Sequence, residues 1–267
     1  MKKIIFTLTI LLSIYELSGQ NVNIHEICII GETHSKTSYC NSNILDSILT
    51  RIKPDLILVE LDSSFFTSGF QYDTVKRPYL LDESKSSNSI IATNLYIKNN
   101  KQTDIRPFDI TGRNDFYVKN DFFNKQNDMY TAILKYASTD SINERDYRDF
   151  VLLTTSLHAL NSLKISTLKE LNSQPVTNLA YLQQEIYLNS ALNLVESIDT
   201  LKAYKEFAHL QNDFWIERNS QMIQNIIKLA KNYKRTVVLT GNLHKYYLHL
   251  GVINSDESFL FKEFWEY

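Results

Sequence analysis

The sequence predicts an α/β protein with a central, mostly parallel sheet flanked by helices, and a large helical insertion between the third strand and the last strands. Two nearly continuous apolar runs, at 24–31 and 55–61, flank one amphipathic segment, which is typical of a βαβ unit. Helical spacing of Leu and Ile then dominates residues 113–233. A β-branched run at 235–240 follows, so the two halves of the sheet lie far apart in the chain.

The N-terminal half supplies the first three predicted strands. Apolar residues with helical spacing over 44–52 follow the first run, and Pro54 ends that helix. After the second run, a helical pattern over 84–99 leads to a third strand at 104–110. Pro107 weakens this last prediction because proline cannot donate a hydrogen bond to a neighbouring strand.

The C-terminal half is expected to be helical until the sheet resumes. Pro175 separates two of the helices, and the last long helix is predicted over 201–233. The strand at 235–240 follows, and a final strand is predicted over 258–264. The helical stretch is therefore expected to pack on the sheet as an insertion or cap.

The first nineteen residues are predicted to be a signal peptide. Two lysines and an apolar run at 4–12 precede small residues ending at Gly19, near which we expect cleavage. The apolar run is too short to cross a membrane comfortably, so no transmembrane segment is expected in the mature chain. Residues 20–267 are expected to form one domain, exported to the periplasm or secreted. An uncleaved anchor or an ordinary first strand is the alternative.

Composition and motifs exclude several function classes. The formal net charge of −2 is evenly spread, so a nucleic-acid partner is not expected. The chain has no glycine-rich phosphate loop, no Gly-x-Ser-x-Gly nucleophile motif and no His-Glu-x-x-His sequence. Cys28 and Cys40 are too few for a disulfide framework and are expected to be small core residues. Their redox state and the oligomeric state stay open.

Two Gly-x-x-His tetrapeptides are the most informative motifs. Gly31–His34 closes the first predicted strand and Gly241–His244 closes the strand at 235–240, in a chain with only six Gly and six His. Open α/β sheets bind ligands just beyond the carboxyl ends of their strands. Glycine allows a sharp turn or a close approach there, and histidine supplies a metal ligand or a general base.

An acid at the end of the second strand, Glu60, completes a candidate site with His34 and His244. Two histidines and a carboxylate are a known ligand set for a catalytic divalent metal such as Mn, Co or Zn. Without metal, a histidine held by a carboxylate is a competent general base for water. The alternatives are that each histidine is a capping or surface residue and that Glu60 pairs with a basic residue. Glu32 either caps the next helix or joins the site.

Two further segments carry candidate site residues. Within the helical stretch 215–222, Arg218 lies at the border of an apolar stripe, from which its guanidinium could reach inward to an anionic or carbonyl group. A solvated Glu-Arg face is the alternative. Asp109 lies at the end of the third predicted strand and is either a turn residue or a site residue.

Four sequence blocks carry a resemblance to a known superfamily. GETH, PDLILVELD, ERNSQM and VVLTGNLH occur in this order between residues 27 and 244. The pattern resembles the superfamily that joins Tiki/TraB proteins, erythromycin-esterase-like enzymes and ChaN-like haem-uptake proteins. Tiki-type members imply a divalent-metal peptidase, esterase-like members imply hydrolysis through activated water, and ChaN-like members imply haem binding. The GETH spelling favours the last two groups, and VELD favours the first.

The resemblance and the residues together predict an exported hydrolase, a metal-dependent peptidase or esterase acting on a peptide or ester. Arg218 would stabilise the oxyanion and Asn219 would orient it or a substrate group. A haem- or small-ligand-binding protein is the alternative. The expected catalytic residues are His34, Glu60, Arg218, Asn219 and His244, with Glu32 and Asp109 secondary and with His34, Glu60 and His244 as metal ligands.

Overall fold

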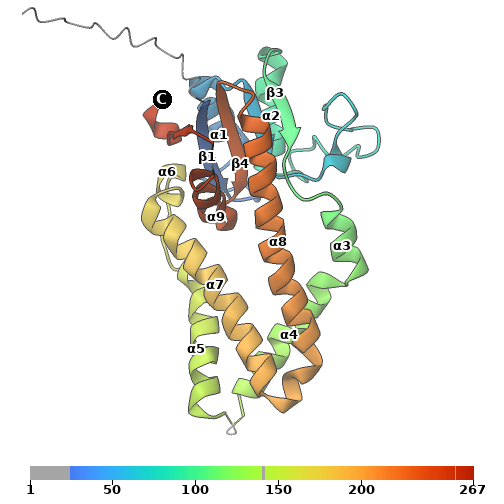
Figure 1. Ribbon diagram of the computed structural model, residues 1–267, viewed down its shortest axis with the longest axis vertical. Coiled ribbons are helices and arrows are strands. Elements are labelled where there is room, and N and C mark those ends of the chain that lie inside the picture. The colour runs from blue at the N-terminus through green and yellow to red at the C-terminus, as the bar shows by residue number, and fades with distance from the viewer. Residues whose placement is uncertain (1–24, 140–141, 256) are drawn as a thin grey trace, which may run out of the picture.

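The predicted α/β architecture is confirmed. The computed structural model describes residues 25–139, 142–255 and 257–267. The predicted signal peptide, residues 1–19, lies outside the described residues. Five strands form one sheet in the order β3-β2-β4-β1-β5, and every neighbouring pair is parallel (Figure 1).

The strand β4 joins the two halves of the chain because it lies between β1 and β2. All five strands begin within one residue of their predicted starts, but the second, third and fifth are shorter than expected. Pro107 is the last residue of its strand, where its missing N–H costs least. The strands are β1 (His25–Glu32), β2 (Leu56–Val59), β3 (Asp104–Pro107), β4 (Arg235–Gly241) and β5 (Phe259–Phe261).

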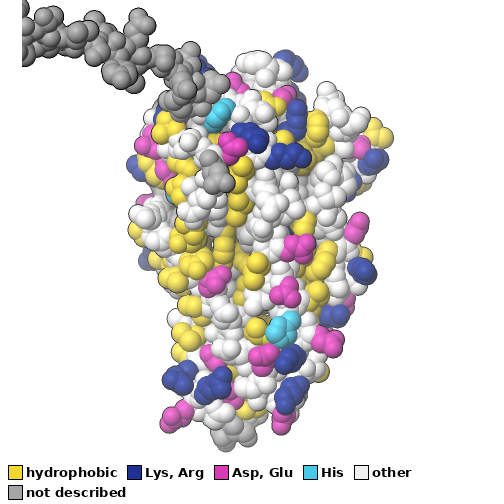
Figure 2. Space-filling view, viewed as in Figure 1, with side chains coloured by type: hydrophobic (Ala, Val, Ile, Leu, Met, Phe, Trp, Pro, Cys, Tyr) yellow, Lys and Arg dark blue, Asp and Glu magenta, His cyan; other side chains and the backbone are white. Residues whose placement is uncertain are grey.

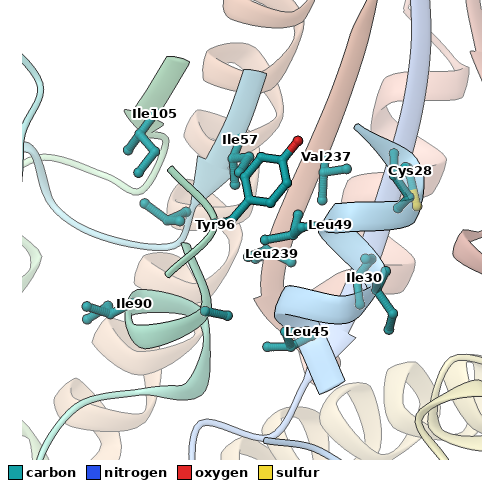
Figure 3. Packing of buried hydrophobic residues seen from close by; sticks show 14 of the residues in the cluster. Cys28, Ile30, Leu45, Leu49, Ile57, Ile90, Tyr96, Ile105, Val237 and Leu239 are labelled. Carbon is teal, nitrogen blue, oxygen red and sulfur yellow. The ribbon is translucent and has the colours of Figure 1, made fainter. Parts of the chain in front are cut away.

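Helices cover both faces of the sheet. On one face, α1 (Ser42–Ile52) and α2 (Asn88–Asn99) pack against alternate strand residues such as Ile57 and Leu239 (Figure 3). On the other face, the C-terminal part of α8 (Lys205–Ala230) and α9 (Asn242–Ile253) pack against the intervening residues, among them Leu58 and Val238. The three central strands, β1, β2 and β4, are buried on both faces, which explains their nearly continuous apolar sequences.

The helical insertion forms an elongated arm with a hydrophobic core of its own (Figure 1). Acidic and basic side chains are interspersed over its lower end in Figure 2. The long helix predicted from residue 201 begins at Lys205, because a short 3-10 turn precedes it. The arm contains α3 (Arg113–Lys119), α4 (Phe122–Ala137), α5 (Glu144–Ala159), α6 (Leu168–Leu171), α7 (Gln174–Ser197), η2 (Asp199–Tyr204) and the first part of α8.

The carboxyl ends of the strands meet the base of the arm, and this junction positions the candidate site. The chain leaves β3 and enters α3, while α8 runs back from the arm to the sheet (Figure 1). Short 3-10 turns lie after β2, at η1 (Ser63–Phe65), and near the C-terminus, at η3 (Phe264–Glu266). Within the residues that the structure describes, no helix is long and apolar enough to span a membrane.

Candidate functional site

The side chain of Arg218 lies at the centre of the candidate site and is only 7% exposed. Its Nε and Nη2 atoms donate to the two carboxylate oxygens of Asp109, each over 2.8 Å. Nη2 also donates to Glu60 Oε1 over 2.5 Å, and Nη1 lies 3.2 Å from His244 Nε2. The prediction that Arg218 reaches inward is therefore confirmed, and its partners come from the ends of β2 and β3 and from α9.

Glu60 is a buried carboxylate held from three sides. Besides Arg218, its partners are the Thr240 hydroxyl at 2.8 Å and the Gly241 backbone N–H at 2.6 Å, both donating to Oε2. Burial by itself raises the pKa of Glu60. Attraction to His244 in its protonated form at low pH, to Arg218 and to protonated His34, together with the Gly241 N–H, outweighs burial, so the pKa lies well below its usual range. Glu60 is therefore ionised at neutral pH, with Arg218 as its counter-ion.

His244 is a buried, neutral imidazole. Burial lowers its pKa to about 4; Glu60 opposes this shift and Arg218 adds to it. Asn219 donates its amide N–H to the Trp215 carbonyl, so its Oδ1 accepts from His244 Nδ1 over 2.8 Å. This contact assigns the proton to Nδ1 and leaves Nε2 to accept from Arg218. Trp215 also stacks on the imidazole with ring centroids 4.4 Å apart.

His34 differs from His244 because its side chain is 57% exposed. Its Nε2 lies 4.0 Å from Glu60 Oε1, and its Nδ1 lies 3.8 Å from Glu32 Oε1. The ring borders a cavity of about 540 Å³ between the strand ends and the segment after β2, whose walls also include Glu60 and Arg113. His34 thus lies between two carboxyl groups, and solvent or a ligand can reach its imidazole.

Glu32, at the end of β1, is a second buried carboxyl group, only 1% exposed. Neither of its oxygens has a well-aligned hydrogen-bond partner among the described residues, although Ser89 lies close by. Burial raises the pKa of Glu32 to about 8; Ser89 opposes the shift and the negative charge of Glu60 adds to it. We therefore expect Glu32 to be mostly protonated at neutral pH, beside His34 rather than at a helix start.

Replacing Glu32 with Gln is expected to change how stability depends on pH. Between the usual pKa of 4.5 and the folded value of about 8, the folded protein retains a proton that the unfolded chain has lost. The free energy of unfolding of the native chain therefore falls as pH rises through this window, by at most about 1.4 kcal/mol per pH unit. The Gln variant lacks this fall, so it gains stability relative to the native chain.

Urea unfolding of both chains at about pH 5 and about pH 8 measures this effect. The stability difference between them should grow toward the higher pH. A difference that is equal at both values would show that Glu32 titrates normally.

The two glycines explain why the same tetrapeptide occurs twice. A Cβ on Gly241 would lie 2.9 Å from His34 Nε2, and a Cβ on Gly31 would lie 3.1 Å from the Asn242 Cα. Each glycine therefore lets the other motif approach closely. The Asn172 side chain from the arm fixes this edge further, accepting from the Gly31 N–H over 2.7 Å and donating to its carbonyl over 2.8 Å.

The predicted metal ligands converge, but Arg218 lies among them. His34 Nε2 and His244 Nε2 lie 4.0 and 3.8 Å from Glu60 Oε1. The guanidinium donates to Glu60 and His244, so it holds the position that a cation would take. No three His, Cys, Asp or Glu side chains are grouped to hold a metal ion within the described ranges. This donor set does not fit a metal in the arrangement seen, and the metal site stays a prediction for metal analysis to test.

The structure places every predicted site residue at one edge of the sheet. Glu60, Asp109, Arg218, Asn219 and His244 form one connected network, and His34 and Glu32 lie beside it. The sequence analysis missed four further residues at this edge. Three of them, Thr240, Trp215 and Arg113, lie within four residues of predicted site residues in the sequence, whereas nothing in the sequence around Asn172 marks it.

Arg113 extends the network toward the cavity. Its Nη1 donates to Asp109 Oδ2 over 2.5 Å, so Asp109 carries two guanidinium groups. Asp109 is 4% exposed and Arg113 borders the cavity. Asp109 precedes α3, and Arg113 is the first residue of that helix. This spacing of four residues between an acid and a base is the sequence signal that could have identified the pair.

Both cysteines are buried and free, as expected for small core residues. Comparison of the chain with protein-family models, with curated proteins and with solved structures gave no match. The superfamily resemblance therefore remains a hypothesis based on four sequence blocks whose residues lie together in the fold.

Proposed function

We propose that the protein is a hydrolase in which His34 activates water for attack on an ester or peptide carbonyl. The observation that carries this proposal is the position of His34. Its accessible imidazole lies between two carboxyl groups, on the wall of a cavity, beside a buried network of charged groups. A histidine placed in this way is a competent general base.

The proposed reaction needs one proton to be moved twice. His34 takes a proton from water while the water oxygen bonds to the carbonyl carbon, and the carbonyl oxygen becomes an oxyanion. The C–O or C–N bond then breaks, and His34 returns the proton to the leaving group. The ionised Glu60, 4.0 Å from His34 Nε2, stabilises the imidazolium that forms between these steps.

Arg113 lines the cavity and supplies positive charge where the oxyanion would develop, and the buried Arg218 is linked to it through their shared partner Asp109. Both donate to Asp109, which fixes their guanidinium groups before the substrate binds. Fixed charges in a buried site stabilise a developing charge without reorganisation. Asn219 positions His244 by accepting a hydrogen bond from its Nδ1. Because the Nε2 of His244 accepts from Arg218, this imidazole takes no part in moving the proton.

The test is a panel of aryl esters and short peptides assayed with and without a chelator, and with added Mn²⁺, Co²⁺ or Zn²⁺. We expect hydrolysis of an ester or an amide that persists after chelation. Activity lost on chelation and restored by one metal would replace the metal-free step with metal catalysis. Full activity in both His34→Ala and His244→Ala would overturn the assignment of the site. No hydrolysis, together with a haem absorption band on titration, would favour the haem-binding alternative.

Replacing Gly241 with Ala is expected to lower the activity by about tenfold or more. The new Cβ would lie 2.9 Å from His34 Nε2, so the imidazole must move away from Glu60. The backbone of Gly241 has a φ of −58°, which alanine adopts readily, so the fold should tolerate the change. Steady-state kinetics measure the loss. Gly69→Ala is the matched control because a Cβ there meets only the Thr67 hydroxyl, at 3.9 Å.

A further inference from the structure

One wall of the cavity is formed by cationic side chains from a single segment. Residues 73–87 lie between η1 and α2 (Figure 1) and contribute Lys76, Arg77 and Lys85 to the lining. His34 and Glu60 belong to the same cavity. A ligand that contacts His34 is therefore within a cavity that also has three cationic groups on its wall.

These cations are unevenly neutralised. Lys76 pairs with Asp73 at 3.4 Å and Lys85 pairs with Asp82 at 3.6 Å, but neither acid is part of the lining. Among the described residues, Arg77 has no carboxylate partner within ion-pair distance; its Nη2 donates to the Ser64 hydroxyl over 3.2 Å. A guanidinium has five N–H donors, so most of those of Arg77 remain for a ligand.

The carboxylate of the lining, Glu60, does not offset this charge because Arg218 already neutralises it. Arg113, at the end near Asp109, is paired with that carboxylate at 2.5 Å, so these four groups together add no net charge to the cavity. The guanidinium of Arg77 lies 4.0 Å over the Phe65 ring, which fixes its orientation. The remaining walls are largely apolar and include Leu61, Phe65, Tyr79, Leu80 and Ile90.

We propose, resting on the proposed hydrolase function, that the substrate carries an anionic group, a carboxylate or a phosphate, at a distance from the bond that is cleaved. Arg77 binds this anion, with Lys76 and Lys85 adding to the field. The apolar body of the substrate packs against Phe65 and Tyr79, and the scissile carbonyl lies toward His34. The planar guanidinium suits two parallel hydrogen bonds to either anion.

A binding experiment tests the anion site without requiring catalysis. Calorimetric titrations use three probes of similar shape: phenylpropionate, phenyl phosphate and the neutral phenylpropanamide. We expect at least one anion to bind about tenfold more tightly than the amide, and the tighter anion identifies the preferred group. Arg77→Gln should remove this preference and Arg77→Lys should keep part of it, whereas Arg148→Gln, an exposed change on α5, should match the native chain. Equal affinities for all three probes, or an unchanged preference in Arg77→Gln, would overturn the proposal.

A kinetic experiment separates this inference from the hydrolase proposal. The substrates are para-acetoxyphenylacetate and its neutral amide, which share the same ester bond. We expect the ratio of their kcat/KM values to favour the anion about tenfold, to fall at high salt and to approach unity in Arg77→Gln. Hydrolysis that depends on His34 with a ratio of unity would overturn the anion site alone. Selective anion binding without any hydrolysis would overturn the hydrolase proposal alone.

Discussion

Replacing His34 with Ala is expected to lower kcat/KM for ester or peptide hydrolysis by about 10² to 10⁴-fold. The reason is that His34 is the imidazole that borders the cavity, while His244 is buried and its Nε2 accepts from Arg218. His244 has no accessible nitrogen with which to replace the lost base. Steady-state kinetics with the best substrate of the panel measure the effect.

Stability should hardly change in the same variant. The His34 side chain is 57% exposed, and its distances to Glu32 and Glu60 exceed hydrogen-bond length. Exposed substitutions of this kind usually alter the free energy of unfolding by about 0.5 kcal/mol or less. His158→Ala, on α5 in the arm, is the matched control and should retain native activity. A His34 variant with native kcat/KM would remove the general base from the mechanism.

Replacing Arg218 with Met is expected to destabilise the fold by about 3–5 kcal/mol. Methionine keeps the unbranched apolar stem of arginine but is shorter and uncharged, so the change leaves Glu60 and Asp109 buried without the cation that neutralises them. Burial of an unpaired carboxylate opposes its ionisation. In the native chain, burial lowers the pKa of Arg218, but the negative charges of Glu60 and Asp109 outweigh burial and raise the pKa above its usual value. The three groups therefore stabilise one another's charges.

The loss of stability in Arg218→Met should be larger at neutral than at acidic pH. In the native chain, the lowered pKa of Glu60 contributes stability that is present above its unfolded value of 4.5 and is lost as pH falls further. Without Arg218 the part of this contribution that comes from its charge disappears, while the parts from His244, His34 and the Gly241 N–H remain. The difference in free energy of unfolding between native and variant chains is therefore larger at about pH 7 than at about pH 4.

Urea unfolding at both pH values measures this difference, with Arg148→Met on the exposed surface of α5 as the control. Arg218→Lys should recover only part of the stability, because an ammonium group cannot reproduce the paired contacts to Asp109. Loss of less than about 1 kcal/mol in Arg218→Met would mean that the network is not held by its central cation.

The order of the strands and helices follows from local sequence patterns. The apolar runs that become β1, β2 and β4 are each buried on both faces, so their sequences lack the alternation of half-exposed strands. The parallel pairing implied by the first βαβ unit then places the strand ends at one edge. This reasoning was sufficient to bring Glu60, Asp109 and both Gly-x-x-His motifs to the same part of the molecule.

The roles of the two histidines could not be predicted in the same way. Both follow a strand at the same spacing from a glycine, yet one is exposed and the other is buried under Trp215. The difference arises because His244 lies in the first turn of α9, against α8, whereas His34 lies in a loop that borders the cavity. Packing between helices from distant parts of the chain decides which imidazole meets solvent.

The sequence by itself determined the parallel α/β sheet, the helical insertion and the residues gathered at the strand ends, because these depend on short-range patterns and on the geometry of parallel strands. Only the tertiary structure decided that the guanidinium of Arg218 lies between Glu60, Asp109 and His244. That position depends on how α8 crosses the sheet edge. Local periodicity fixes which way a helical residue faces, but not which partner it meets.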